Sequence, residues 1–95
     1  MEQSLASYIE HTLLRPETSA AEIDQLCQEA LEQGFAGVCV NGAWLSRVVS
    51  NLRGGSVRPV CVVGFPLGSM SSECKAFEAR WCVDQGAQEL DMVLA

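Results

Sequence analysis

An acidic residue inside an apolar strand is the feature of this sequence that most directly indicates chemistry. Residues 89–95 read ELDMVLA. In a strand, Glu89 and Asp91 share one face. The opposite face carries Leu90, Met92 and Leu94, which we expect to lie under helices. A carboxylate on a buried face is costly unless it is paired or used. Asp91 is therefore either a functional group or part of a structural ion pair.

The other titratable candidates lack the partners that a catalytic set needs. His11 is the single histidine, and no Ser or Cys nucleophile stands in a known arrangement with it. A structural hydrogen-bonding role is favoured for His11. Lys75 is the single lysine and lies beside Glu73 and Glu78 in the first turn of a predicted helix. This setting indicates a solvated helix face rather than an activated amine.

The cysteines give no sign of a metal site. The chain has five, at positions 27, 39, 61, 74 and 82, with no Cys-x-x-Cys pair. One histidine and this spacing do not make a zinc site. Cysteines scattered through apolar runs are typical of buried thiols in a reducing compartment. The cysteines therefore predict no metal site.

The segment VVGFPLGS, residues 62–69, joins a predicted strand to a predicted helix. Its two glycines stand where a phosphate-binding loop could form. Neither the Gly-x-Gly-x-x-Gly pattern nor the Gly-Lys-Ser/Thr pattern is present. A tight strand-to-helix turn is the favoured interpretation.

Composition limits the classes of partner. The chain has 95 residues, is 48% hydrophobic and carries a formal net charge of −6. An acidic chain without a basic cluster disfavours nucleic acid and anionic membranes as partners. The start of the sequence lacks the basic and apolar regions of an export signal, and no apolar run reaches the length of a membrane span. We expect a single cytoplasmic domain over residues 1–95.

The elements that must position these residues alternate along the chain. Predicted helices cover residues 19–33, 43–52 and about 72–85, and predicted strands cover 8–14, 35–40, 57–65 and 89–95. Ser19 and Glu22 form a capping-box pattern, and Gly34 suits a left-handed C-terminal cap. In the third helix, the predicted inward stripe is Cys74, Phe77 and Trp81. The order is (βα)₃β, which indicates a parallel sheet with right-handed crossovers.

Two architectures satisfy this order: a small open doubly wound sheet, or part of a (β/α)₈ barrel. Polar side chains on one face of the strands favour the barrel. Cys39 and Asn41 share a face of one strand, as Glu89 and Asp91 do of another. In an open sheet helices cover both faces, whereas a barrel lumen tolerates a carboxylate near its catalytic end.

Five blocks then resemble, in order and spacing, the N-terminal half of deoxyribose-phosphate aldolases. They are HTLLRPE (11–17), GFAGVCVN (34–41), VVGFPLG (62–68), ECKAFEA (73–79) and GAQELDMV (86–93). The resemblance implies half of a TIM (β/α)₈ barrel. The family cleaves 2-deoxyribose 5-phosphate to glyceraldehyde 3-phosphate and acetaldehyde through a lysine Schiff base, without metal or cofactor.

The resemblance assigns roles to individual residues. Asp91 matches an aspartate that relays protons with an ordered water. Thr12 and Cys39 match positions that line the substrate pocket, and Asn41 has a lining role in its block. Two mild departures are Glu10, where Asp is usual, and Gly42, where Pro is usual. The Schiff-base lysine, a second lysine and the phosphate loops of the family lie in its C-terminal half and have no counterpart here; Lys75 matches a helix lysine.

These comparisons lead to three hypotheses for the 95-residue chain. The first is an aldolase half-barrel without activity alone, which covers its open strand edges by forming a homodimer or higher assembly. The second is a working aldolase, either completed by a separate C-terminal half or using Lys75. The third is a non-catalytic protein that binds a sugar phosphate.

Overall fold

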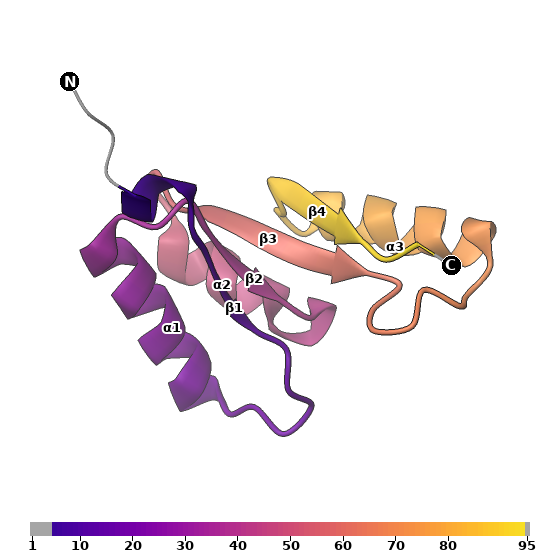
Figure 1. Ribbon diagram of the computed structural model, residues 1–95, viewed down its shortest axis with the longest axis horizontal. Coiled ribbons are helices and arrows are strands. Elements are labelled where there is room, and N and C mark those ends of the chain that lie inside the picture. The colour runs from indigo at the N-terminus through magenta and orange to yellow at the C-terminus, as the bar shows by residue number, and fades with distance from the viewer. Residues whose placement is uncertain (1–4, 95) are drawn as a thin grey trace.

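The structure is a computed structural model that describes residues 5–94. A four-stranded parallel sheet has the order β1-β2-β3-β4, with one helix after each of the first three strands (Figure 1). This is the (βα)₃β order expected from the sequence. The elements are a 3₁₀ helix Leu5–Tyr8, β1 Glu10–Leu13, α1 Ala20–Gln33, β2 Gly37–Val40, α2 Gly42–Leu52, β3 Arg58–Val63, α3 Ser72–Asp84 and β4 Glu89–Met92.

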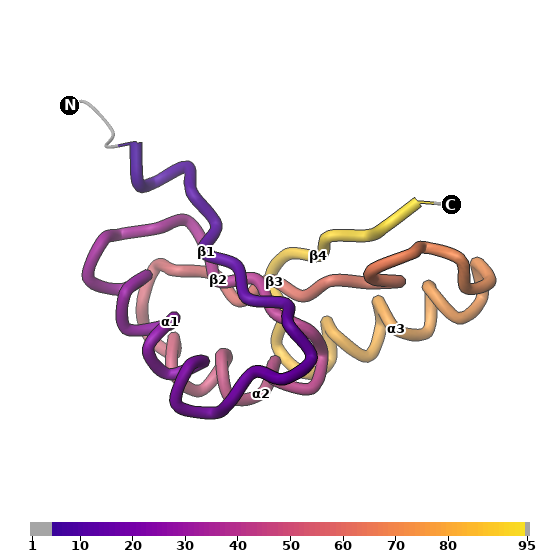
Figure 2. The backbone as a smooth tube through the Cα atoms, turned by 60° about the horizontal axis from the view of Figure 1, so that its bottom comes forward, coloured from indigo at the N-terminus to yellow at the C-terminus, as the bar shows by residue number. Residues whose placement is uncertain are grey.

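The sheet has one covered face and one open face. Figure 2 shows α1, α2 and α3 on the same side of the strands. The covered face packs into two apolar clusters, one between α1, α2 and the sheet and one between α2, α3 and the sheet. An open doubly wound sheet would have helices on both faces. One-sided coverage with a parallel order is the arrangement of a half-barrel, whose open face is the lumen.

The signals that delimit α1 act as the sequence predicts. Ser19 Oγ accepts a hydrogen bond from the backbone N–H of Glu22, and the Glu22 side chain accepts one from the backbone N–H of Ser19. Gly34 ends the helix at φ 68°, in the left-handed region that favours glycine. Both ends of α1 are therefore fixed by local hydrogen bonds.

All four strands are shorter than predicted. The predicted ranges are 8–14, 35–40, 57–65 and 89–95, and the observed strands are Glu10–Leu13, Gly37–Val40, Arg58–Val63 and Glu89–Met92. The first strand begins at Glu10, because the chain up to Tyr8 forms a 3₁₀ helix. The last strand, β4, ends at Met92; Ala95 lies outside the described residues. Pro59 is the second residue of β3, as expected for a residue without a ladder donor.

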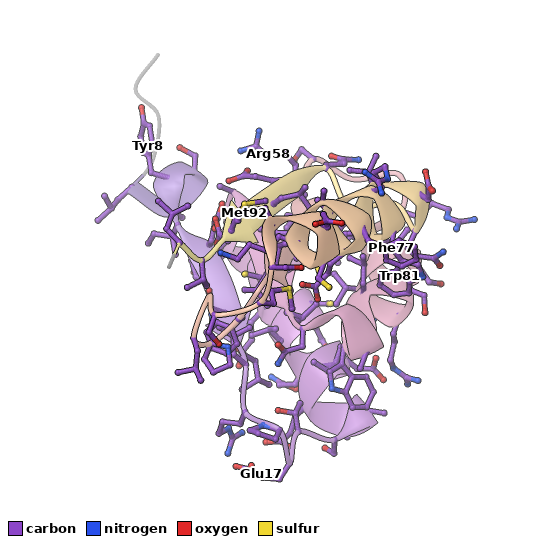
Figure 3. The ribbon with its side chains drawn as sticks, turned by 90° about the vertical axis from the view of Figure 1, so that its right-hand side faces the viewer. Tyr8, Glu17, Arg58, Phe77, Trp81 and Met92 are labelled. Atoms are coloured by element: carbon purple, nitrogen blue, oxygen red, sulfur yellow. The ribbon has the colours of Figure 1, made fainter. Side chains whose placement is uncertain are left out.

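The prediction for the buried face of α3 is wrong. Phe77 is 67% exposed and lies on the outside of the helix (Figure 3). Trp81 is 41% exposed, and its ring contacts Gly42 at the start of α2 rather than the sheet. Cys74 is exposed as well. The buried residues of α3 are Lys75 and Cys82. Apolar residues occur on more than one side of this helix, so periodicity alone selects the wrong face.

The expectation for the apolar residues of the last strand holds for one of three. Leu90 packs against the cluster between α3 and the sheet. Met92 is 46% exposed and Leu94 is 79% exposed. Helix α3 contacts β3 and β4 on the covered face but does not bury these two side chains. The edge of the sheet at β4 therefore carries exposed apolar surface.

Among residues 5–94, no helix combines the length and the apolar character that crossing a membrane requires.

Candidate functional site

The open face of the sheet collects the polar residues that the sequence analysis singled out. Strand register aligns Thr12 with Cys39, Cys39 with Val60, and Val60 with Glu89. Alternation then places Asp91 on the same face, where it aligns with Val62. Residues far apart in sequence thus meet in one lumen.

Asp91 and Cys39 form the central contact of this face. The Cys39 thiol donates a hydrogen bond to Asp91 Oδ2, with the two atoms 3.6 Å apart. Cys39 is 2% exposed, whereas Asp91 is exposed on the open side. Burial, followed by the Asp91 charge, raises the pKa of the Cys39 thiol to about 12. Cys39 is therefore a neutral donor near pH 7.

A cluster of three carboxyl groups occupies the same lumen. One carboxylate oxygen from each of Glu10, Glu89 and Asp91 lies within 4.8 Å of the other two. A hydrogen bond with Glu89, burial, and the charges of Glu89 and Asp91 raise the pKa of Glu10 to about 7, against a smaller opposing effect of Arg58. Arg58 reaches Glu89 at 3.5 Å. Carboxylate oxygens are ligands that hard divalent cations accept, but such ions need six or more oxygens.

Glu10 is a residue of this cluster that was not predicted as a site residue. Glu10 and Glu89 lie on the outermost strands, β1 and β4, and meet only because the sheet curves. The alternation of β1, which places Glu10 and Thr12 on one face, is the signal that could have identified it.

Glu10 makes the stability of the chain depend on pH. Because its pKa is raised to about 7 in the folded state, the folded chain holds a proton that the unfolded chain releases near pH 4.5. The stability contribution of this proton is complete below about pH 4.5 and is lost as the pH rises to about 7. A Glu10→Gln variant should therefore melt several degrees above wild type at pH 8, and the gain should be much smaller at pH 4.5.

The measurement is the melting temperature of both proteins by circular dichroism at the two pH values. Glu17→Gln is the matched control, because Glu17 is an exposed glutamate in the loop after β1 (Figure 3). An equal gain for Glu10→Gln at both pH values, or the same pH dependence in the control, would contradict the titration assigned to Glu10.

Two adjoining pockets open at the carboxyl ends of the strands. The smaller, of about 350 Å³, is lined by Thr12, Leu14, Cys39, Val62, Phe65, Leu90, Asp91, Met92 and Val93. The larger, of about 650 Å³, is lined by Leu14, Arg15, Pro16, Asn41, Phe65 and Pro66. The two share Leu14 and Phe65. A ligand that contacts Asp91 in the smaller pocket could extend past these two side chains into the larger one.

The structure brings together three of the four predicted site residues. Thr12, Cys39 and Asp91 line the smaller pocket, and Asn41 lines the larger one. The side-chain amide of Asn41 donates to the carbonyl oxygen of Leu14 at 3.0 Å. Asn41 therefore holds the loop after β1 against the end of β2, which gives it a structural as well as a lining position.

His11 lies on the covered side of β1, away from the pocket that holds Asp91. Its Nε2 is 2.7 Å from Glu29 Oε1 on α1, and its ring meets Phe35 edge-on at a centroid distance of 5.1 Å. This geometry agrees with the structural role predicted for His11.

The prediction of a solvated Lys75 is wrong. Lys75 is 9% exposed. A Cβ built on Gly64 would lie 3.2 Å from Lys75 Cε, so the aliphatic part of the side chain packs against this glycine. Long cationic side chains can bury their methylene groups in this way. Lys75 lines neither of the two pockets.

The cysteines follow the prediction at four of five positions. Cys27, Cys39, Cys61 and Cys82 are buried, and Cys74 is exposed. Cys74 is exposed because α3 turns a different face to the sheet from the predicted one.

This chain is similar to known proteins that are named deoxyribose-phosphate aldolase. It is 49% identical over 90 residues to a deoxyribose-phosphate aldolase of Bdellovibrio bacteriovorus, covering 95% of this chain and 41% of that relative. It is also 49% identical over 92 residues to one of Clostridium kluyveri, covering 97% of this chain and 42% of that relative. The chain thus spans about two-fifths of the length of these relatives. No family model matches the chain.

Solved aldolase structures are similar to this chain over about the same share of their length. The tetrameric deoxyribose phosphate aldolase from Aeropyrum pernix superposes with a TM-score of 0.88 at 33% identity, covering 95% of this chain and 38% of that one. A solved aldolase described as QR15 superposes with a TM-score of 0.85 at 36% identity, covering 93% and 39%. The fold of this chain is therefore that of half an aldolase barrel.

Proposed function

We propose, from the homology of this chain to the N-terminal part of deoxyribose-phosphate aldolases, that it supplies one half of an aldolase active site. The reaction would be cleavage of 2-deoxyribose 5-phosphate to glyceraldehyde 3-phosphate and acetaldehyde. The observation that carries the proposal is the position of Asp91. Its carboxylate lines a pocket at the carboxyl end of the strands, with Cys39 and Thr12 beside it. TIM-barrel active sites occupy this end of the barrel.

In this proposal Asp91 moves the protons of the reaction. Cleavage of a carbon–carbon bond next to a Schiff base requires a proton to leave a hydroxyl group and a proton to reach the carbon fragment. Asp91 is exposed toward the pocket, so a bound water or ligand can reach its carboxylate. The Cys39 thiol, which donates to Oδ2, orients the carboxylate. Thr12 and Asn41 line the space that the sugar phosphate would occupy.

We propose that the amine of the reaction comes from outside these 95 residues. Lys75 is the single lysine, and its side chain packs against Gly64 rather than lining the pocket. Without an amine at the pocket no Schiff base forms. The 95-residue polypeptide by itself is therefore proposed to be inactive. No metal or cofactor takes part.

The remaining strands would cover the open face of the sheet. Both β1 and β4 have an unpaired edge in the described residues. A C-terminal half-barrel can supply four further strands and the lysine. A second copy can also close the sheet, with β1 of each copy beside β4 of the other and a two-fold axis between them. We propose self-association of the isolated polypeptide, and cytoplasmic localisation in view of its free thiols.

The test of this function is an aldol-cleavage assay on the polypeptide co-expressed with the C-terminal half of a homologous deoxyribose-phosphate aldolase. Cleavage of 2-deoxyribose 5-phosphate is expected from the co-purified pair and from neither part alone. A pair that co-purifies and superposes on an intact aldolase, yet cleaves nothing, would sink the proposal. Activity from the isolated polypeptide would overturn the proposal that the amine comes from outside these 95 residues.

The larger pocket supports a second candidate function, a protein that binds a sugar phosphate without chemistry. This pocket contains one cation, Arg15, among apolar residues. Arg15 also pairs with Glu22 at 2.7 Å, which reduces its availability to a phosphate. If this function holds, 2-deoxyribose 5-phosphate at millimolar concentration should raise the melting temperature of the isolated polypeptide. Inorganic phosphate is the control ligand, and no shift with the sugar phosphate would exclude this function.

A further inference from the structure

Gly64, the first residue of the loop after β3, is hydrogen-bonded to α3. Its backbone N–H donates to Glu78 Oε1 at 2.7 Å. Its carbonyl oxygen accepts from the backbone N–H of Gly68 at 2.7 Å, which closes the loop on itself. Gly64 has φ 71°, a conformation that other residues adopt at a cost. The hydrogen bond to the Glu78 carboxylate therefore helps to fix the direction in which the loop leaves the sheet.

Lys75 fills the space under the same residue. Its side chain is 9% exposed, and three of its methylene carbons lie 3.2–3.6 Å from the position that a Cβ on Gly64 would occupy. Lys75 and Glu78 lie three residues apart on α3, so both face Gly64 from one side of the helix. Lys75 packs its methylene groups against Gly64, and Glu78 accepts the hydrogen bond from the Gly64 N–H.

The fastened loop forms a wall of the candidate site. Phe65 lines both pockets, and Pro66 lines the larger one. Phe65 is 40% exposed, so packing around its ring does not by itself fix the position of the ring. The backbone conformation at Gly64 therefore limits where the ring can lie. A small rotation at Gly64 would move the ring into or out of the space beside Asp91.

We propose that Glu78 and Lys75 are positioning residues that set the Phe65 wall of the substrate pocket. This inference rests on the proposed function for the identity of the substrate, 2-deoxyribose 5-phosphate. Neither residue lines either pocket. Their loss should therefore weaken substrate binding more than it slows the chemical step, which depends on Asp91 and the amine.

The first test uses the isolated polypeptide and no ligand. Amide hydrogen exchange, followed residue by residue by NMR, reports the Gly64 N–H. Glu78→Ala should accelerate exchange at Gly64 by about 10-fold or more relative to the rest of β3, because a hydrogen bond to a charged group is lost. Glu78→Gln should retain most of the protection, because its amide oxygen still accepts. Glu73→Ala, which removes an exposed carboxylate from the same helix, should have no effect.

The lysine provides a second pair of variants if Glu78→Ala does not fold. Lys75→Met keeps an unbranched apolar side chain of similar length, whereas Lys75→Ala leaves the space under Gly64 empty. Protection of Gly64 should persist in Lys75→Met and fall in Lys75→Ala. Unchanged exchange at Gly64 in both alanine variants, or in the one that folds, would overturn the proposal.

The second test uses the pair co-expressed with a C-terminal half. Glu78→Ala should raise KM for 2-deoxyribose 5-phosphate about 10-fold with kcat within about twofold of wild type, and Glu78→Gln should restore KM. A fall in kcat with KM unchanged would contradict a positioning role. If the wild-type pair is inactive, the proposed function fails, and the exchange measurement alone then decides whether Glu78 and Lys75 hold the loop.

Discussion

An Asp91→Asn substitution is expected to lower kcat for cleavage of 2-deoxyribose 5-phosphate by roughly 100-fold or more in the pair co-expressed with a C-terminal half. A positioned acid–base group contributes about 10²–10⁴ to a rate, and an amide cannot take up the proton that a carboxylate accepts. The side chain keeps its size, and the amide oxygen can still accept the hydrogen bond from Cys39. The measurement is kcat for the variant pair beside the wild-type pair.

Two further measurements make this result specific. Asp84→Asn, which removes an exposed carboxylate at the end of α3, should leave kcat unchanged. In Asp91→Asn the pKa of the Cys39 thiol should fall from about 12, because the Asp91 charge is the largest contribution after burial. NMR titration of the Cys39 carbons reports this pKa. A lowered Cys39 pKa with unchanged kcat would show that Asp91 contacts the thiol but takes no part in proton transfer.

The isolated 95-residue polypeptide is expected to form dimers or larger assemblies at micromolar concentration. The edges of β1 and β4 are unpaired in the described residues, and the edge at β4 carries Met92 and Leu94, which are 46% and 79% exposed. An unprotected strand edge with apolar side chains recruits another strand. Met92→Lys should therefore shift the population toward the monomer. Light scattering coupled to size exclusion measures the mass.

Phe77→Lys is the control for this prediction. Phe77 is 67% exposed and lies on the outside of α3, away from the strand edges (Figure 3). If the strand edges mediate association, Phe77→Lys should leave the assembly intact. Dissociation by Phe77→Lys with no effect of Met92→Lys would show that the helices mediate association instead. A folded wild-type monomer would contradict self-association altogether.

The order of elements could be predicted from the sequence because each signal is local. The capping box of Ser19 and Glu22 and the left-handed Gly34 lie within a few residues of the ends that they set. The face of α3 could not be predicted, because Phe77 and Trp81 outweigh Lys75 on any scale of hydrophobicity. Space beside Gly64 buries Lys75 instead, and this space depends on two elements meeting.

The candidate site could also be predicted only in part from the sequence. Alternation along β4 identified Asp91, and the resemblance identified its neighbours Thr12 and Cys39, which the strand register places side by side. The meeting of Glu10 and Glu89 was not predictable, because the two strands lie at opposite edges of the sheet. Only the curvature that closes half a barrel brings their side chains together.

We propose above that this chain contributes the proton-transfer half of an aldolase site and that its partner contributes the amine. Borohydride reduction in the presence of 2-deoxyribose 5-phosphate, followed by peptide mass spectrometry, tests it most directly. We expect a reduced adduct on a lysine of the C-terminal half, formed only when this chain is present, and none on Lys75. An adduct on Lys75, or one on the C-terminal half that forms equally well without this chain, would contradict it.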